Sequence, residues 1–135
     1  MNVSFDVVGI VISAFICFAL AALWFSPALF GKLWLREMQK NGSIIQEFTE
    51  LKMYYYVFIP LIVFAVVENI IVDIFSISGL REGVGIGIAI WLLISSAHAA
   101  IHFAFERRSI ILFGIYSSYY LAASVVISTI LSMRQ

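Results

Sequence analysis

Charged residues are scarce in this chain of 135 residues, where Asp, Glu, Lys and Arg together make up 12%. A soluble domain has about 25% charged residues and roughly 45–50% apolar ones, whereas 63% of this chain is hydrophobic. A small soluble core cannot bury so much apolar surface, but lipid can cover it. The shortage of charge therefore excludes an ordinary soluble domain and predicts an integral membrane protein.

Several other features are missing as well. The eight basic and eight acidic residues cancel, and no basic stripe with interleaved aromatics is present, which excludes nucleic acid as a partner. Cys17 is the single cysteine, so no intrachain disulfide can form. The chain has no phosphate-binding glycine loop, nucleophile elbow or Cys/His metal spacing. We therefore predict no cofactor and no catalytic residue.

Four apolar runs are long enough to cross the ~30 Å hydrocarbon core, which takes about 18–20 helical residues. They predict an all-α integral membrane bundle, one domain over 1–135, with spans at about 7–25, 53–77, 83–105 and 109–133. No Lys or Arg precedes the first run, and it is too long for the apolar part of a signal peptide, so we expect a retained anchor. Ser26-Pro27 should end or bend that span.

A short amphipathic helix is predicted over 28–40, after the first span. Apolar residues recur there at helical spacing, and basic residues occupy much of the remaining arc: Leu29, Phe30, Leu33, Trp34 and Met38 against Lys32, Arg36 and Lys40. Such a helix lies in the headgroup region. We expect Trp24, Trp34, Lys32 and Arg36 to be its interface anchors. An ordinary connecting loop is the alternative.

The distribution of positive charge predicts the orientation. Six basic residues fall in the first and third loops, namely Lys32, Arg36, Lys40, Lys52, Arg107 and Arg108, against Arg81 and Arg134 on the other side. Basic loops stay in the cytoplasm. Both termini are therefore expected outside.

Small residues form stripes at i, i+4 spacing on three of the predicted spans. The stripes are Gly9, Ser13, Cys17 and Ala21; Gly83 and Gly87; Gly114, Ser118 and Ala122; and Ser124, Ser128 and Ser132. Close approach over small residues drives helix association in lipid. Two such faces on the last span exceed what one neighbour requires, which predicts a homo-oligomer. The alternative is a four-helix monomer that uses both faces internally.

Three polar residues lie within the second span: Glu68, Asn69 and Asp73. An ionisable group at membrane depth costs at least ~2.5–3.5 kcal/mol, so it usually has a partner or a function. Asp73 is expected near the outer interface, sharing a face with Asn69. A protonatable Glu68 would suit a proton-coupled cycle. The structural alternative is that Glu68 hydrogen-bonds to Asn69 or to a serine on another helix.

His98 and His102 stand one helical turn apart in the third span. Such a pair can bind a transition metal, but the pattern is weak, and hydrogen-bonded or interfacial histidines are the alternative. Glu106 is expected to pair with Arg107 or Arg108. With the second and third spans antiparallel, His98 would lie roughly 10 Å from Glu68 along the axis, too far for a hydrogen bond. The indole of Trp91 is expected nearer to that depth.

The block from Ala22 to Trp34 carries a family resemblance. It reads Ala-Leu-Trp-Phe-Ser-Pro-Ala-Leu-Phe-Gly-Lys-Leu-Trp and resembles the block that closes the first span in the small, mostly bacterial membrane proteins grouped as domain of unknown function 1761. Phe105-Glu106 and the paired Tyr119-Tyr120 look similar too. The resemblance implies a four-span inner-membrane protein and brings no reaction, substrate or catalytic residue.

Three functions follow from these patterns. The first is a small transport or permeation unit for an ion or small molecule, with a titratable Glu68 supported by Asn69 and Asp73. The second is a structural or accessory protein that oligomerises or binds a partner through small-residue faces. The least favoured is a metal-dependent enzyme using His98 and His102. A polar cavity reaching Glu68 would favour transport, whereas a dry bundle with Glu68 bonded to a neighbouring helix would count against it.

Overall fold

The computed structural model describes residues 4–40, 52–106 and 109–135, and these residues form helices joined by turns. The elements are α1 (Val7–Trp24), α2 (Gly31–Lys40), α3 (Lys52–Ile74), α4 (Leu80–Ile90), the π-helix η1 (Trp91–Ser95), α5 (Ser96–Glu106) and α6 (Ile110–Ser132). α4, η1 and α5 follow one another as one long helical stretch. The predicted pairing of Glu106 with Arg107 or Arg108 lies outside the described residues.

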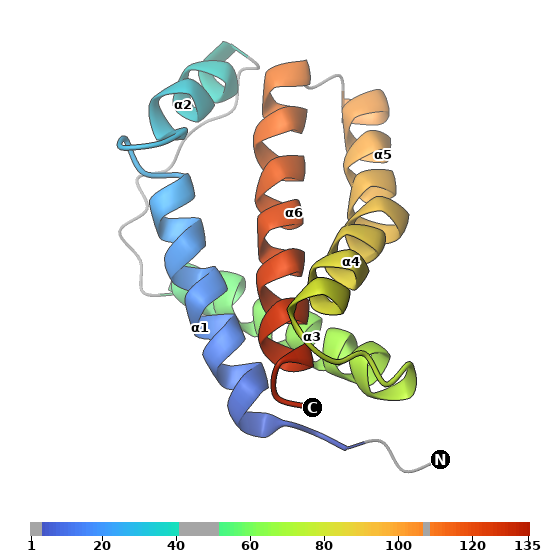
Figure 1. Cartoon of the computed structure of the whole chain (residues 1–135). Coiled ribbons are helices and arrows are strands. Elements are labelled where there is room, and N and C mark those ends of the chain that lie inside the picture. Colours follow the sequence, from blue (N-terminus) through green and yellow to red (C-terminus); the bar gives the residue numbers. More distant parts are fainter. Residues whose placement is uncertain (1–3, 41–51, 107–108) are drawn as a thin grey trace.

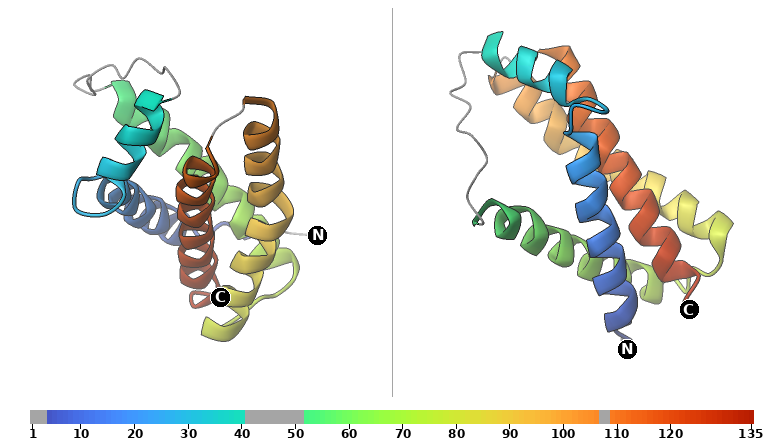
Figure 2. Two further views of the ribbon diagram at one scale, coloured as in Figure 1. Left: turned by 90° about the horizontal axis from the view of Figure 1, so that it is seen from above. Right: turned by 90° about the vertical axis from the view of Figure 1, so that its left-hand side faces the viewer.

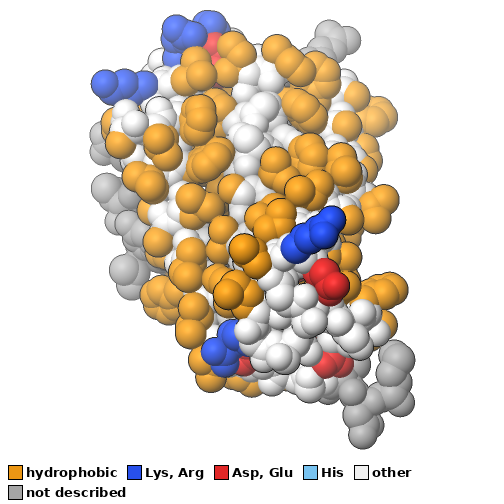
Figure 3. Space-filling model, viewed as in Figure 1, with side chains coloured by type: hydrophobic (Ala, Val, Ile, Leu, Met, Phe, Trp, Pro, Cys, Tyr) orange, Lys and Arg blue, Asp and Glu red, His pale blue; other side chains and the backbone are white. Residues whose placement is uncertain are grey.

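Four of these helical stretches are long and apolar enough to cross a bilayer, so the predicted all-α, four-span fold is confirmed. They cover Val7–Trp24, Tyr55–Ile74, Leu80–Phe105 and Ile110–Ser132. The first span ends just before Ser26-Pro27, as predicted. Phe25 caps the helix, and its backbone N–H donates to the carbonyl of Ala21. Hydrophobic side chains cover most of this face of the molecule, and Lys or Arg side chains lie at its upper end, at its lower left edge and near its middle (Figure 3).

α6 is the centre of the fold. It packs against α1, α3 and α4, and it also contacts α2, η1 and α5. α1 lies on one side of α6 and the α4–α5 stretch on the other (Figure 1). The start of α1 and the end of α6 lie at the same end of the molecule, and α2 lies across the opposite end (Figure 2). The predicted helix after the first span is therefore present, and its place among lipid headgroups stays a prediction.

α3 does not run alongside the α4–α5 stretch as two antiparallel neighbours would. It is steeply inclined to α1 and α6 (Figures 1 and 2), and these two are its packing partners. Its buried residues lie between Leu61 and Val72, while Tyr55, Tyr56 and Ile59 are exposed. The first turns of α3 therefore diverge from the rest of the bundle.

Small residues explain the close packing of α4 against α6. A Cβ atom on Gly87 would lie 2.7 Å from Cα of Val125 and 2.9 Å from the carbonyl oxygen of Ser124, and a Cβ on Gly83 would collide with the Ser132 hydroxyl. Only glycine allows the two backbones to come this near. Gly85, between the two, would meet nothing within 4 Å.

Most of the small-residue stripes are used inside one chain. All four members of the α1 stripe are buried, and the thiol of Cys17 lies 3.6 Å from the carbonyl of Ala123 on α6. Ser124, Ser128 and Ser132 are buried as well. Gly114 is exposed and would meet nothing within 4 Å. This arrangement matches the monomer alternative for three of the four stripes; the homo-oligomer stays a prediction.

Candidate functional site

Glu68 lies at the centre of the bundle and is fully buried. The hydroxyl of Ser124 donates to its Oε1 at 2.7 Å, and the hydroxyl of Ser128 donates to its Oε2 at 2.5 Å. Ser124 also lies 3.0 Å from the carbonyl of Gly87. Because the two serines stand one turn apart on α6, they present both hydroxyls to one carboxyl group. The cluster therefore joins α3, α4 and α6.

Asn69 and Asp73 face a different partner, the segment that precedes α1. The side-chain oxygen of Asn69 accepts from the N–H of Asp6 at 3.1 Å, and its amide nitrogen donates to the carbonyl of Ser4 at 2.8 Å. Asp73 accepts from the Ser4 hydroxyl at 2.5 Å and from the Ser4 N–H at 3.2 Å. The predicted trio of Glu68, Asn69 and Asp73 thus divides into two unrelated clusters.

Asp6 completes this terminal cluster. Its carboxylate accepts from the N–H of Gly9 at 3.0 Å, which caps α1, and it forms a two-pronged ion pair with Arg134, with Nη2 at 3.0 Å from Oδ1. The hydrogen bond from Arg134 holds the pKa of Asp6 below its ordinary value, helped by the Gly9 N–H and opposed by partial burial. The start of the chain is thereby tied both to α3 and to the residues after α6.

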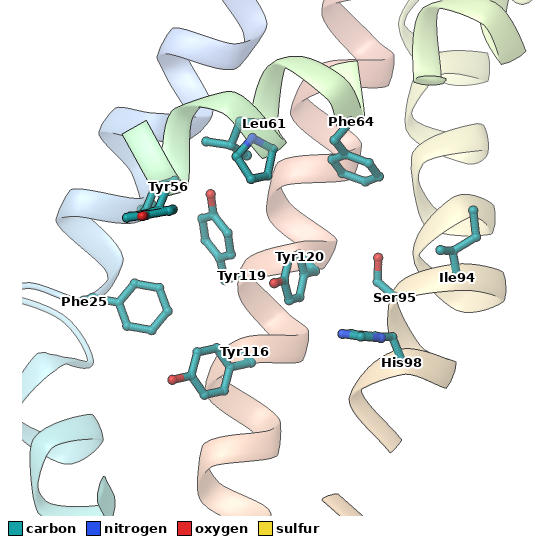
Figure 4. A pocket seen from close by; sticks show the side chains of 13 residues that line it. Phe25, Tyr56, Leu61, Phe64, Ile94, Ser95, His98, Tyr116, Tyr119 and Tyr120 are labelled. Atoms are coloured by element: carbon teal, nitrogen blue, oxygen red, sulfur yellow. The ribbon is translucent and has the colours of Figure 1, made fainter. Parts of the chain in front are cut away.

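A pocket of about 500 Å³ opens where the first turns of α3 diverge from α6 and α5 (Figure 4). Its walls are mainly apolar and aromatic, with a minority of polar side chains. The lining residues are Ala21, Phe25, Tyr56, Val57, Pro60, Leu61, Phe64, Ile94, Ser95, His98, Tyr116, Tyr119 and Tyr120. Glu68 is not one of them, so the pocket does not reach the buried carboxyl group.

Local structure brings three groups of side chains to this pocket. On α6, Tyr116, Tyr119 and Tyr120 share one face at i, i+3 and i+4. On the other side, the π-helix η1 ends at Ser95, and the Ser96 N–H bonds to the carbonyl of Trp91 five residues back. Single π-helical turns within α-helices frequently occur at functional sites. Here the π-turn places Ser95 on the pocket wall (Figure 4).

The polar groups of the pocket differ in whether they already have partners. The hydroxyl of Tyr119 donates to the carbonyl of Cys17 at 3.1 Å, and that of Tyr116 accepts from the indole N–H of Trp34 at 2.8 Å. Ser95 is 8% exposed, yet within the described part of the chain neither its hydroxyl nor that of Tyr120 makes a hydrogen bond. Both hydroxyls can be reached from the pocket: Tyr120 is 38% exposed, and Ser95 Oγ is not fully buried, unlike the unpaired Thr129 Oγ1. These two hydroxyls are thus available to a ligand.

The two histidines lie close together, with ring centroids 4.5 Å apart. Among the described residues, no group of three or more His, Cys, Asp or Glu side chains could hold a metal ion. His98 belongs to the pocket wall. The indole N–H of Trp91 donates to the carbonyl of Ser117 on α6 at 2.9 Å, so Trp91 is not the hydrogen-bond partner of Glu68.

The two tryptophans among the predicted interface anchors also contact α6. The indole of Trp24 donates to the carbonyl of Ile115 at 3.2 Å, and that of Trp34 donates to Tyr116. Lys32 and Arg36 are exposed on α2. A role for these anchors at a lipid surface stays a prediction.

Glu37 on α2 is buried and forms ion pairs, with Arg36 at 3.7 Å and Lys40 at 2.8 Å. Hydrogen bonds with Lys40 and Ser109 lower the pKa of Glu37.

Neither the pocket nor the partners of Asn69 were predicted from the sequence. The pocket does have a sequence signal, because three tyrosines on one face of an apolar span are unusual. The terminal cluster had a weaker one, the polar residues Ser4 and Asp6 just ahead of the first span. The π-turn at η1 has no evident signal in the sequence.

Comparison with known proteins gives a family match that spans nearly the whole chain. The family model described as "Protein of unknown function (DUF1761)" matches residues 8–132. No curated protein and no solved structure matches the chain. The match covers the helices that build both the Glu68 cluster and the pocket.

Proposed function

Because this chain belongs to the DUF1761 family of proteins of unknown function, we propose its function from the site alone: it is a membrane protein that binds a small amphiphilic molecule from the bilayer. The ligand occupies the pocket between α3, α5 and α6. Binding, rather than chemistry on the ligand, is its activity. This proposal differs from the predicted transport or permeation role, which required a polar cavity reaching Glu68.

The observation that carries the proposal is the pocket itself. Its volume of about 500 Å³ falls within the roughly 300–1,000 Å³ of small-molecule sites, which combine mainly apolar walls with a few polar groups. Its tyrosine, serine and histidine side chains supply those polar groups. A gap left by imperfect packing would not need them.

The surroundings of the pocket support entry from lipid. Leu93 and Ile94 on η1 are 78% and 53% exposed, and Val63 on α3 is 58% exposed. Exposed aliphatic side chains on spanning helices face hydrocarbon rather than water. A ligand that reaches the pocket past these side chains therefore comes from the lipid phase.

Glu68 takes a structural role in this proposal. Its carboxyl group is fully buried and bonded to two serines of α6, which is the arrangement expected of a dry bundle. The accessory-protein alternative draws less support, since most small-residue faces already pack within the chain.

Photolabelling with benzophenone tests this function. Protein in lipid nanodiscs is irradiated with the compound, and the labelled residues are mapped by mass spectrometry. We expect labelling to concentrate on the pocket residues, to fall strongly in Ile94→Trp, which narrows the pocket at its exposed edge, and to persist in Leu93→Trp, whose side chain faces lipid next to it. Labelling spread evenly over the lipid-facing helices in all three proteins would contradict the proposal.

A further inference from the structure

The pocket also indicates which chemical class it accepts. We propose that its ligand is an uncharged, ring-bearing molecule with a hydroxyl or carbonyl group, and that Ser95 and Tyr120 hydrogen-bond to that group. This inference rests on the proposed function and adds the identity of the ligand's polar end. Three independent features of the lining residues support it.

The first feature is the state of the Ser95 hydroxyl. Serines in helices commonly satisfy themselves by bonding to a carbonyl one turn back, as Ser118 does with Gly114 at 2.6 Å and Ser96 does with Leu92. Ser95 does not, although it is more than nine-tenths buried. Its hydroxyl borders the pocket (Figure 4). Water is scarce at membrane depth, so the missing partner is expected on the ligand.

The second feature is the aromatic lining. Tyr116 and Tyr120 on α6 and Phe64 on α3 surround the pocket with Phe25 (Figure 4). Aromatic rings pack on one another in offset-stacked or edge-to-face arrangements, and such pairs are stabilised beyond the effect of the area that they bury. Several such rings around one space favour a planar ring over a flexible acyl chain. The hydroxyl of Tyr120 adds a second unpaired polar group on the same wall.

The third feature is the absence of formal charge. None of the lining residues is Asp, Glu, Lys or Arg. A charged headgroup would therefore enter a weakly polar space without an opposite charge, which is strongly unfavourable. Hydroxyl and imidazole groups both donate and accept hydrogen bonds, so they can bind either a hydroxyl or a carbonyl group of the ligand.

Two compounds that differ in one group test this inference: biphenyl and 4-phenylphenol. Their binding to protein in lipid nanodiscs is measured by equilibrium dialysis, and partition into protein-free nanodiscs is subtracted. We expect 4-phenylphenol to bind about 3- to 10-fold more tightly than biphenyl, the effect of one net hydrogen bond. Ser95→Ala should remove most of that difference. Tyr120→Phe, which keeps the ring, should reduce it.

Ser96→Ala is the matched control, because the Ser96 hydroxyl already bonds to its own helix; it should preserve the difference. If both compounds bind equally to the unmodified protein, or if Ser95→Ala and Tyr120→Phe leave the difference intact, the proposed ligand class is wrong and the proposed function stands. If neither compound binds, both are overturned, and a dimer by native mass spectrometry would then identify a second copy as the occupant.

Discussion

Replacing Glu68 with alanine is expected to destabilise the protein by about 2–4 kcal/mol, because the Glu68 side chain joins α3 to α6. The variant loses the hydrogen bonds from Ser124 and Ser128, at 2.7 Å and 2.5 Å. Side-chain hydrogen bonds between membrane helices average ~0.6 kcal/mol and reach ~1.7, so the pair contributes roughly 1–3 kcal/mol. Truncating a fully buried side chain also leaves a cavity, which adds about 1 kcal/mol.

Glu68→Gln separates a structural role from a titrating one. Glutamine keeps the shape, and its carbonyl oxygen can accept from one serine while its amide donates to the other. We therefore expect it to stay within about 1 kcal/mol of the original stability. Val67→Ala, the lipid-facing neighbour that is 43% exposed, is the control and should have little effect on stability.

The assay is reversible unfolding in mixed detergent micelles, followed by circular dichroism, with proton flux into proteoliposomes measured on the same variants. The structural role requires Glu68→Gln to be stable and to leave any proton flux unchanged. A Glu68→Gln protein as unstable as Glu68→Ala would refute the hydrogen-bonding argument. A stable Glu68→Gln protein that abolishes an existing proton flux would instead support the titrating Glu68 predicted from the sequence.

Three further predictions follow from other contacts. Gly87→Ala should destabilise the protein by about 1–3 kcal/mol, because the added methyl group overpacks against α6. Gly85→Ala, where a Cβ meets nothing within 4 Å, should be neutral or stabilising by up to about 1 kcal/mol. Equal shifts of the unfolding midpoint in the two variants would contradict the packing argument. Asp6→Asn keeps a good helix cap but loses the ion pair, so it should cost no more than about 1 kcal/mol near pH 7. Because the pKa of Asp6 is lowered in the folded protein, its contribution to stability is complete above the unfolded pKa of about 3.9 and is lost as the pH falls through the lower folded value. If the stability difference between the unmodified protein and Asp6→Asn instead widens in acid, the ion-pair assignment is wrong. Elemental analysis of purified protein should find less than stoichiometric zinc, copper or nickel. One metal ion per chain, absent from a protein with both His98→Phe and His102→Phe, would instead establish the metal site.

The number and order of the spans could be predicted because the length of an apolar run is a local property of the sequence. The same holds for the end of the first span at Ser26-Pro27 and for the small-residue faces, which follow from helical periodicity. Which neighbour each face contacts is not local. It depends on the rotation and tilt of whole helices, and the sequence carries no direct record of either.

Glu68 illustrates this limit. Its depth and its need for a partner could be inferred from the apolar run around it, and a serine on another helix was one of the two predicted partners. Selecting Ser124 and Ser128 over Asn69 requires the position of α6 relative to α3. The tyrosine face of α6 is visible in the sequence, but the pocket that it lines is not, since the opening depends on the tilt of α3 relative to α6.

The central position of α6 has a consequence for biosynthesis. α6 follows the other helices in the sequence, yet it supplies the partners of Glu68 and the surface against which α4 packs. During co-translational insertion, α3 must therefore enter the bilayer while its carboxyl group still lacks both serines, at a cost of about 2.5–3.5 kcal/mol for a charged group at the helix centre. Until α6 arrives, Glu68 and the glycine face of α4 lack their partners, so substitutions in α6 are expected to appear first as reduced membrane yield.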